Sequence, residues 1–188
     1  DVYKRQVCYH YYRAHRDARL EGTLVGATAM SSCYRNEGRA TGGLRRLCEF
    51  SMREIIFLGA KQAVIEKRDA LLRVQRRMLE RLRLDALIHT ASDPFFIGAY
   101  EKQRLFQAAF DLKYEVKAYL PSEHDWFAVG SVNFHQDHFG KAFNIRLPDG
   151  ELAQSCCLGF GIDRWCFAVF TQHGIDKSRW PRAVADLV

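Results

Sequence analysis

Residues 31–50, SSCYRNEGRATGGLRRLCEF, constrain the chain more than any other stretch. The first part alternates arginine and glutamate, and on a strand such charges are costly unless they face a ligand or each other. Arg35 and Glu37 are two residues apart and would share one strand face, and Arg46 and Phe50, four apart, would share a face of the partner strand. The glycine- and arginine-rich loop between the two segments has a composition that can shape itself around a phosphate chain. The stretch therefore predicts a two-stranded anion-binding unit with an aromatic ring beside it.

A second motif, GFGIDR at residues 159–164, lies far away in the sequence. It places Arg164 on the first turn of an expected helix, after glycines that let the backbone come close to a ligand. An arginine beside a carboxylate, with an aromatic opposite, can bind a phosphate, a base amino group and a base ring together. The two parts together predict an ATP site.

The secondary-structure pattern predicts an α+β domain built on antiparallel strands with inserted helices. The clearest helix is expected at 60–85, where apolar residues recur at helical spacing opposite arginines. Residues 7–15 are expected to form a short strand or a helix end, and 101–121 to be part helix and part strand. A buried helix is expected after the GFGIDR glycines. Further strands are expected at 28–37, 47–58, 126–134, 141–147 and 151–157.

Length and composition bound the classes of protein that are possible. A chain of 188 residues with 48% hydrophobic residues can bury one core, so residues 7–188 are expected to form a single domain. DVYKRQ at 1–6 has the look of a non-native leader. No apolar run approaches the roughly 18 residues of a membrane span and no signal-peptide pattern opens the chain, so a cytoplasmic protein is expected. Much of the net charge of +6 lies at 66–85, which is either a solvated basic face or a surface for an anionic partner.

The motifs resemble the catalytic core of class II aminoacyl-tRNA synthetases. YRNE and RLCEF, at 34–37 and 46–50, are similar to the second signature motif of that class, and GFGIDR to the third. With DPFF, NFHQDHFG, NIR and SCCLGFGIDR, the chain resembles the amino acid:[carrier protein] ligases over about residues 7–175. Those ligases are homologues of the zinc-dependent, methanogen-type seryl-tRNA synthetases. The resemblance implies an antiparallel sheet flanked by helices, truncated at its N-terminus because the first motif, which builds the dimer interface, is not visible.

The resemblance also assigns roles in ATP binding. Arg35 would hold the α-phosphate and stabilise the charge that builds on it. Glu37 would accept a hydrogen bond from the adenine amino group, and Phe50 would stack on the adenine with Arg164 on the other face, near the γ-phosphate. Arg46 would contact the γ-phosphate, with Arg45 as its rival.

Relatives of this kind hold a catalytic zinc ion with two cysteines and a glutamate. By position the resemblance implies Cys33, Cys157 and Glu80, with Glu66 in reserve. Two thiolates and a carboxylate leave one tetrahedral position open for the amine of an amino acid. Without the motifs, Cys33 and Cys157 would be interpreted as buried thiols, as Cys156 is.

Three other residues near the motifs have more than one possible role. His135 and His138 would be structural or would line the substrate pocket, rather than form a metal pair. Glu54 is either a carboxylate on the magnesium side of the site or a strand-paired residue.

The resemblance implies an ATP- and magnesium-dependent ligase that forms the adenylate of a small amino acid, such as glycine or alanine. The aminoacyl group would pass to the phosphopantetheine thiol of a carrier protein, so no protein nucleophile is needed. The full-length enzyme is expected to be a homodimer, with tRNA the less favoured partner. Two alternatives remain: a seryl-like catalytic domain that charges tRNA, and an inactive relative that serves as a binding module.

Overall fold

The computed structural model describes residues 7–35, 43–91 and 112–185. A six-stranded sheet with the order β1-β2-β6-β5-β4-β3 forms its centre, and all neighbouring strands are antiparallel. This confirms the expected α+β class. The expected positions Glu37, 93–96 and 101–111 lie outside the described residues. The strands are β1 Leu24–Tyr34, β2 Glu49–Gly59, β3 Ala86–Thr90, β4 Lys113–Leu120, β5 Asp125–Gln136 and β6 Gln154–Gly161.

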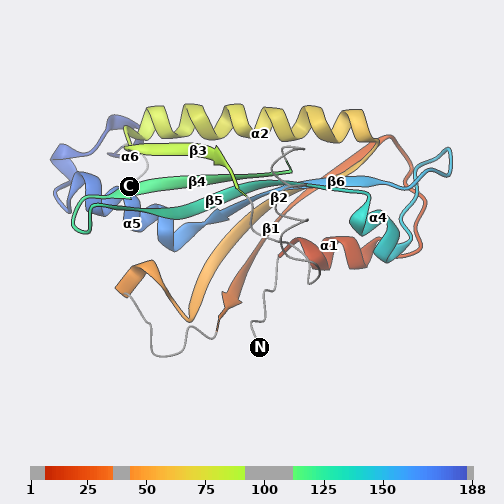
Figure 1. Ribbon diagram of the computed structural model, residues 1–188, viewed down its shortest axis with the longest axis horizontal. Helices are drawn as coiled ribbons and strands as arrows, with labels where there is room; N and C mark the ends of the chain where they lie inside the picture. The colour runs from red at the N-terminus through yellow and green to blue at the C-terminus, as the bar shows by residue number, and fades with distance from the viewer. Residues whose placement is uncertain (1–6, 36–42, 92–111, 186–188) are drawn as a thin grey trace.

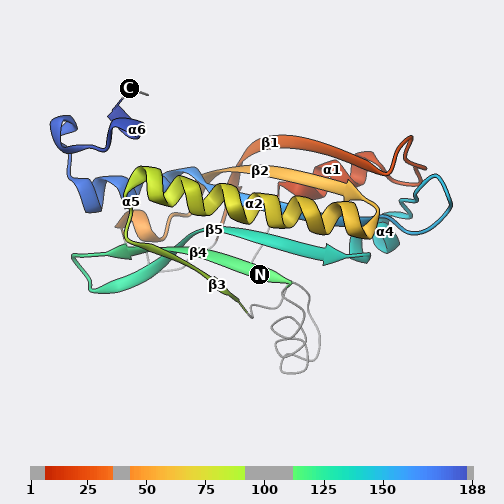
Figure 2. The same ribbon diagram turned by 90° about the horizontal axis from the view of Figure 1, so that it is seen from above.

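Helix α2, Lys61–Leu82, runs along one face of the sheet (Figures 1 and 2). Its buried side chains recur at helical spacing, and Val64 and Leu72 pack against Cys156 and Leu158 of β6. The helix ends where Arg83 adopts the left-handed conformation (φ 49°). The helix expected at 60–85 is confirmed.

Two short helices, α1 Cys8–Ala14 and α4 His138–Phe143, cover the other face of the sheet. Tyr12 and Phe139 stack with their ring centroids 4.1 Å apart, and both belong to a buried cluster that includes Ile56 and Cys157. Successive residues of a strand point to opposite faces. Cys156 therefore faces α2, while Cys157 faces α1 and α4.

Helix α5, Ile162–His173, follows β6 directly. Its Trp165 and Ala168 are buried with Leu79 of α2 and Phe127 of β5. The chain then passes through the 3-10 helix η2, Lys177–Arg179, and helix α6, Arg182–Ala185; a further 3-10 helix, η1 Gly43–Arg45, precedes β2. No helix in the described ranges is both long enough and apolar enough to cross a membrane.

Several local expectations differ from the structure. The strand expected at 141–147 is wrong, because 138–143 form helix α4, which ends at Asn144 with a left-handed φ of 50°. Strand β3 was missed, since its five residues directly follow a much stronger helical pattern. Residues 8–14 are a helix. The glycines of GFGIDR lie within β6 rather than in a turn, and the helix after them is confirmed.

Candidate active site

The β1–β2 hairpin positions the first arginine of the predicted ATP site. Arg35 follows the last residue of β1, and its backbone N–H donates a 2.7 Å hydrogen bond to the carbonyl oxygen of Cys48, which extends the hairpin ladder by one residue. The Arg35 guanidinium carbon lies 5.0 Å from the centroid of the Phe50 ring. The hairpin therefore places a cation beside an aromatic ring.

The expected strand-face pairing of Arg46 with Phe50 is wrong, because Arg46 precedes β2 and follows the 3-10 helix η1. Its neighbour Arg45 forms ion pairs with Glu123 and Asp125, which flank the β4–β5 turn. These pairs raise the pKa of Arg45 and lower that of Asp125. Two carboxylates thus already hold Arg45, the rival of Arg46 for the γ-phosphate.

The start of α5 lies against the same hairpin. The carboxylate of Asp163 accepts a 2.6 Å hydrogen bond from the backbone N–H of Ser51, the residue after Phe50. The next residue, Arg164, donates a 2.8 Å hydrogen bond from Nη1 to the carbonyl oxygen of Ala128 in β5. The two motifs, more than a hundred residues apart, thus meet at one end of β2.

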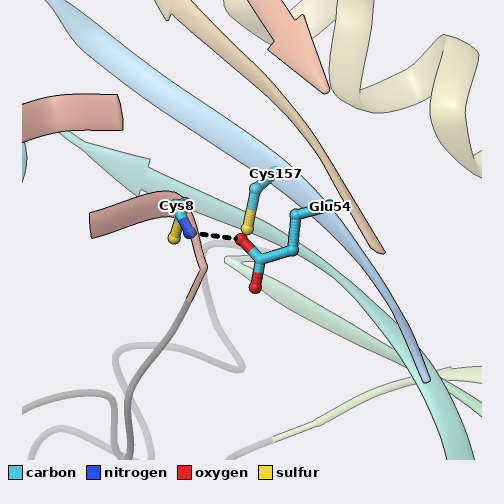
Figure 3. Close-up of side chains that lie close together, drawn as sticks. All are labelled: Cys8, Glu54 and Cys157. Carbon is cyan, nitrogen blue, oxygen red and sulfur yellow. Dashed lines mark hydrogen bonds between the residues drawn. The ribbon is translucent and has the colours of Figure 1, made fainter. Parts of the chain in front are cut away.

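Glu54, four residues beyond Phe50 along β2, forms a buried cluster with two cysteines (Figure 3). Cys8 begins α1, Glu54 lies in β2 and Cys157 in β6, and their ligand atoms all lie within 4.8 Å of one another. The sheet register explains why Glu54 and Cys157 lie close together. Glu54 is opposite Gly159 in β6, and Gly159 is two residues from Cys157 and so shares its face. The side chains of Glu54 and Cys157 therefore point to the same face of the sheet, the one that α1 covers. The Cys8 backbone N–H donates a 2.8 Å hydrogen bond to Oε2 of Glu54, which fixes the carboxylate beneath the helix start.

Burial dominates the electrostatics of this cluster. Desolvation, and then the nearby Cys157 sulfur, raise the pKa of Glu54 to about 8. Hydrogen bonding with Cys8 lowers the pKa of Cys157, while the same bond and burial raise that of Cys8. The shared hydrogen bond therefore favours the thiolate form at Cys157 over that at Cys8. A cation at this place would stabilise the negative charge of the cluster.

The residues present fit a zinc ion. Two sulfurs and one carboxylate are donors that zinc favours, and three protein ligands leave a fourth tetrahedral position for a substrate. Asn133 adds a second observation. Its Nδ2 lies 3.6 Å from the Cys157 sulfur, and its Oδ1 is buried with no hydrogen-bond partner in the described part of the chain. An orphaned acceptor beside the cluster suits a pocket in which a bound molecule supplies a donor.

This cluster differs from the ligand set expected from the sequence. Cys157 belongs to the cluster, but Cys33 and Glu80 do not. Cys33 is buried in β1 near Phe50, and burial together with Glu54 raises its pKa. Glu80 is exposed on α2, as is Glu66, and that helix packs on the face that Cys156 points to, opposite to Cys157. No carboxylate on α2 that points to solvent can reach a ligand on the far side of the sheet.

The sequence carried only a weak signal for the two residues that were missed. Cys8 lies near the first residue of the sequence and follows no motif. For Glu54 the sequence leaves two interpretations, a carboxylate near magnesium or a strand-paired residue. Its position four residues after Phe50, on the same strand face, was the usable signal. Glu54 is 3% exposed, which a carboxylate tolerates only with a partner.

The remaining candidates fall on both sides of the sheet. Cys156 is a packed thiol on the α2 face, 3.5 Å from the carbonyl oxygen of Val64. His135 is buried, and its Nε2 lies 3.7 Å from the Cys157 sulfur. The His138 ring packs edge-on against Phe139, and burial lowers its pKa. The two histidines thus have different surroundings.

Comparison with known proteins agrees with the fold and the motifs. Residues 7–173 match the family described as "tRNA synthetase class II core domain (G, H, P, S and T)". The match covers most of the chain, which therefore belongs to this family of class II synthetase cores.

The relatives include both tRNA ligases and carrier-protein ligases. Amino acid--[acyl-carrier-protein] ligases 1 and 2 of Bradyrhizobium diazoefficiens are 34% and 35% identical, over 96% and 84% of this chain and 55% and 47% of theirs. The type-2 serine--tRNA ligase of Methanopyrus kandleri is 32% identical over 82% of this chain and 31% of its own. The chain thus spans about half the length of the carrier-protein ligases and about a third of the tRNA ligase.

A solved structure gives the same result at the level of the backbone. The crystal structure of A. aeolicus tRNASec in complex with M. kandleri SerRS matches with a TM-score of 0.85 and 28% identity, over 96% of this chain and 36% of that one. A seryl-tRNA synthetase from Pyrococcus horikoshii complexed with ATP matches with a TM-score of 0.70 at 17% identity, over 94% of this chain and 40% of that one, which supports the fold alone.

Proposed function

We propose that this chain is the catalytic core of an ATP-dependent ligase that activates a small amino acid and transfers it to the phosphopantetheine thiol of a carrier protein. In the first step the amino acid carboxylate attacks the α-phosphorus of ATP and pyrophosphate leaves. In the second step the thiol attacks the aminoacyl carbonyl, forming a thioester and releasing AMP. Magnesium would neutralise the phosphates.

One observation carries the proposal: Phe50, which would stack on adenine, and Glu54 of the candidate metal cluster share one face of β2. Phe50 and Glu54 are four residues apart on that face, a separation of about 13 Å along a strand. An extended aminoacyl adenylate can span from a ring at Phe50 to an amine at the Cys8, Glu54 and Cys157 cluster. Asp163 places the start of α5, and with it Arg164, at the Phe50 end.

The charged groups then have distinct tasks. Arg35, held beside Phe50, would bind the α-phosphate and stabilise the charge that develops on it in the transition state. Arg164 would bind the far phosphates together with Arg46, and Glu37 would bind the adenine amino group. A zinc ion held by Cys8, Glu54 and Cys157 would supply a Lewis-acid position for the amine of the amino acid. Asn133 would accept a hydrogen bond from the bound amino acid through Oδ1.

The choice of acceptor rests on the relatives. The two Bradyrhizobium ligases support a carrier protein, and the Methanopyrus relative supports tRNA as the alternative. Thioester formation with a phosphopantetheinylated carrier protein, measured beside tRNA charging under the same conditions, decides between them.

Activation itself is tested by amino-acid-dependent exchange of pyrophosphate into ATP. We expect Arg35→Ala to reduce exchange about 100-fold or more, since one donor to a developing charge contributes about that much. Arg53→Ala is the matched control: Arg53 lies on the same strand but on the opposite face, exposed, where it donates to Thr28. Exchange that is equal in wild-type protein and Arg35→Ala would refute the proposal.

A further inference from the structure

Three buried polar side chains, those of Tyr12, Ser155 and His135, form a network that contacts the Cys157 sulfur. Tyr12 of α1 and Ser155 of β6 both contact Nδ1 of His135, at 3.4 Å and 3.1 Å, and Nε2 of His135 lies 3.7 Å from the Cys157 sulfur. All four residues are buried. A buried network of this kind is costly to build, and the proposed activation step does not by itself require it.

Two observations speak against His135 as a fourth protein ligand. The group whose donor atoms all lie within 4.8 Å of one another contains Cys8, Glu54 and Cys157 but not His135. His135 therefore approaches one sulfur of the cluster rather than its centre. A fourth protein ligand would also fill the position that a substrate amine needs.

The contacts on Nδ1 are compatible with a proton on Nε2. Both neighbours of Nδ1 are hydroxyls, and a hydroxyl can donate its proton to a ring nitrogen. With Nδ1 accepting, the proton of a neutral imidazole resides on Nε2, the nitrogen that faces the sulfur. The ring is held from the sides as well, since it packs edge-on against Phe139, with centroids 4.9 Å apart, and against Tyr12 at 6.0 Å. The packing fixes the position of the ring, and the tautomer with the proton on Nε2 is part of the proposal.

We propose that His135 is a positioning residue of the metal centre, which holds the Cys157 sulfur by a hydrogen bond donated from Nε2, with Tyr12 and Ser155 fixing its tautomer. A hydrogen bond to a ligating sulfur orients the sulfur and tunes the charge it gives to the metal. Asn133 donates to the same sulfur from the adjacent strand position, so Cys157 is held from two directions. Cys8 has a different environment, because its backbone N–H binds Glu54. The proposal makes the two sulfurs unequal, and it rests on the metal centre of the proposed function.

The test compares His135→Phe, which fills the same space without a donor, with His135→Gln, whose amide nitrogen can replace Nε2–H. The matched control is His138→Phe, three residues away, whose ring packs on Phe139. Zinc affinity is measured by competition with a chromophoric chelator. We expect a 10- to 100-fold loss of affinity in His135→Phe, roughly the cost of losing an outer-shell partner. Recovery in His135→Gln and no change in His138→Phe are expected.

A spectroscopic readout separates positioning from mere packing. In the cobalt-substituted protein, loss of a hydrogen bond raises the energy of the sulfur lone pair, so the sulfur-to-cobalt charge-transfer band should move to longer wavelength in His135→Phe and return in His135→Gln. Tyr12→Phe should move it in the same direction by a smaller amount. An unmoved band in His135→Phe would overturn the proposal.

X-ray absorption at the zinc edge tests whether His135 coordinates the metal directly. The wild-type protein should show two sulfurs and no imidazole, and an imidazole in the coordination shell would overturn the positioning role. Failure of the proposed metal centre has a separate signature. In that case Cys8→Ser and Cys157→Ser would bind zinc as the wild type does, whatever the His135 variants do.

Discussion

The backbone N–H of Ser51 donates a 2.6 Å hydrogen bond to Oδ2 of Asp163. This bond joins the strand that carries Phe50 to the first turn of the helix that carries Arg164, and no stretch of nearby sequence connects the two. The bond therefore holds Phe50 and Arg164 at the same end of β2, although it involves only their sequence neighbours. The geometry of the proposed ATP site therefore depends on Asp163, a residue outside the set proposed to bind ATP.

Replacing Asp163 by alanine should weaken ATP binding more than it weakens the fold. A hydrogen bond to a charged group contributes roughly 1.5–3 kcal/mol, so the KM for ATP should rise about 10- to 100-fold in pyrophosphate exchange. Asp163→Asn is the matched control, because its amide oxygen still accepts from Ser51, and it should lie near wild type. Equal KM values in the wild type and Asp163→Ala would show that Ser51 and Asp163 do not set the position of Arg164.

Metal content should depend on Cys8 and not on Cys33. Cys8→Ser and Cys157→Ser remove one sulfur each from the cluster, and we expect purified protein to lose most of its bound zinc in both. Cys33→Ser and Glu80→Gln change the residues first expected from sequence, and they should keep the wild-type zinc content. Elemental analysis of the five proteins, purified in parallel without chelator, measures this. If Cys8→Ser kept the wild-type zinc content and Cys33→Ser lost it, Cys33 and not Cys8 would be the second sulfur ligand, as the sequence first suggested.

The metal-free protein should lose stability as the pH rises, because of Glu54. Its pKa of about 8 in the folded protein lies above the ordinary value of 4.5, so the folded state binds more protons between these limits. The free energy of unfolding therefore falls as the pH rises through this window and levels off above it. Each unit corresponds to about 1.4 kcal/mol, which gives roughly 3 kcal/mol between about pH 5 and pH 7.5.

Glu54→Gln isolates this effect. The amide keeps the acceptor for the Cys8 backbone N–H but does not titrate, so the variant should show a flatter pH dependence and exceed the wild type in stability near pH 7.5. Urea denaturation with chelator and reductant, at several pH values, measures both proteins. Parallel pH profiles for the two would contradict the assignment of the raised pKa to Glu54.

The sequence predicted the parts of the fold that have strong local patterns. The 22 residues of α2 repeat an apolar stripe, and the β1–β2 hairpin and β5 are rich in β-branched and aromatic residues, so these elements were expected and confirmed. Helix α4 was mistaken for a strand because six residues span less than two helical turns, too few for the helical period to show.

The cluster of Cys8, Glu54 and Cys157 was harder to predict for a different reason. Its residues come from α1, β2 and β6, and only the strand register brings them together. The motif residues Arg35, Phe50 and Arg164 have neighbours that identify them, whereas Cys8 has none. A cysteine chosen for its closeness to a motif in sequence, Cys33, proved to be near the cluster but outside it.

Two glycines on the site face should respond differently to the same small change. A Cβ added at Gly159 would lie 3.2 Å from the Cε atom of Met52 and 3.9 Å from Oε1 of Glu54, and Met52 is flexible enough to give way. A Cβ added at Gly140 would lie 2.2 Å from the carbonyl oxygen of Ala153, which is backbone and cannot yield cheaply. Gly159→Ala should therefore fold with nearly wild-type stability, within about 1 kcal/mol, and Gly140→Ala should lose several times more.

Gly159→Ala should lose activity even though it keeps nearly wild-type stability. The methyl group of Gly159→Ala would lie beside Met52 and Glu54, at the cluster end of the proposed path of the aminoacyl adenylate. We expect exchange to fall at least about tenfold while zinc content stays unchanged. Thermal unfolding, zinc analysis and exchange on the same preparations separate the three effects. Gly159→Ala with wild-type exchange would mean that the adenylate does not cross this part of β6, and the span from Phe50 to the cluster would have to be abandoned.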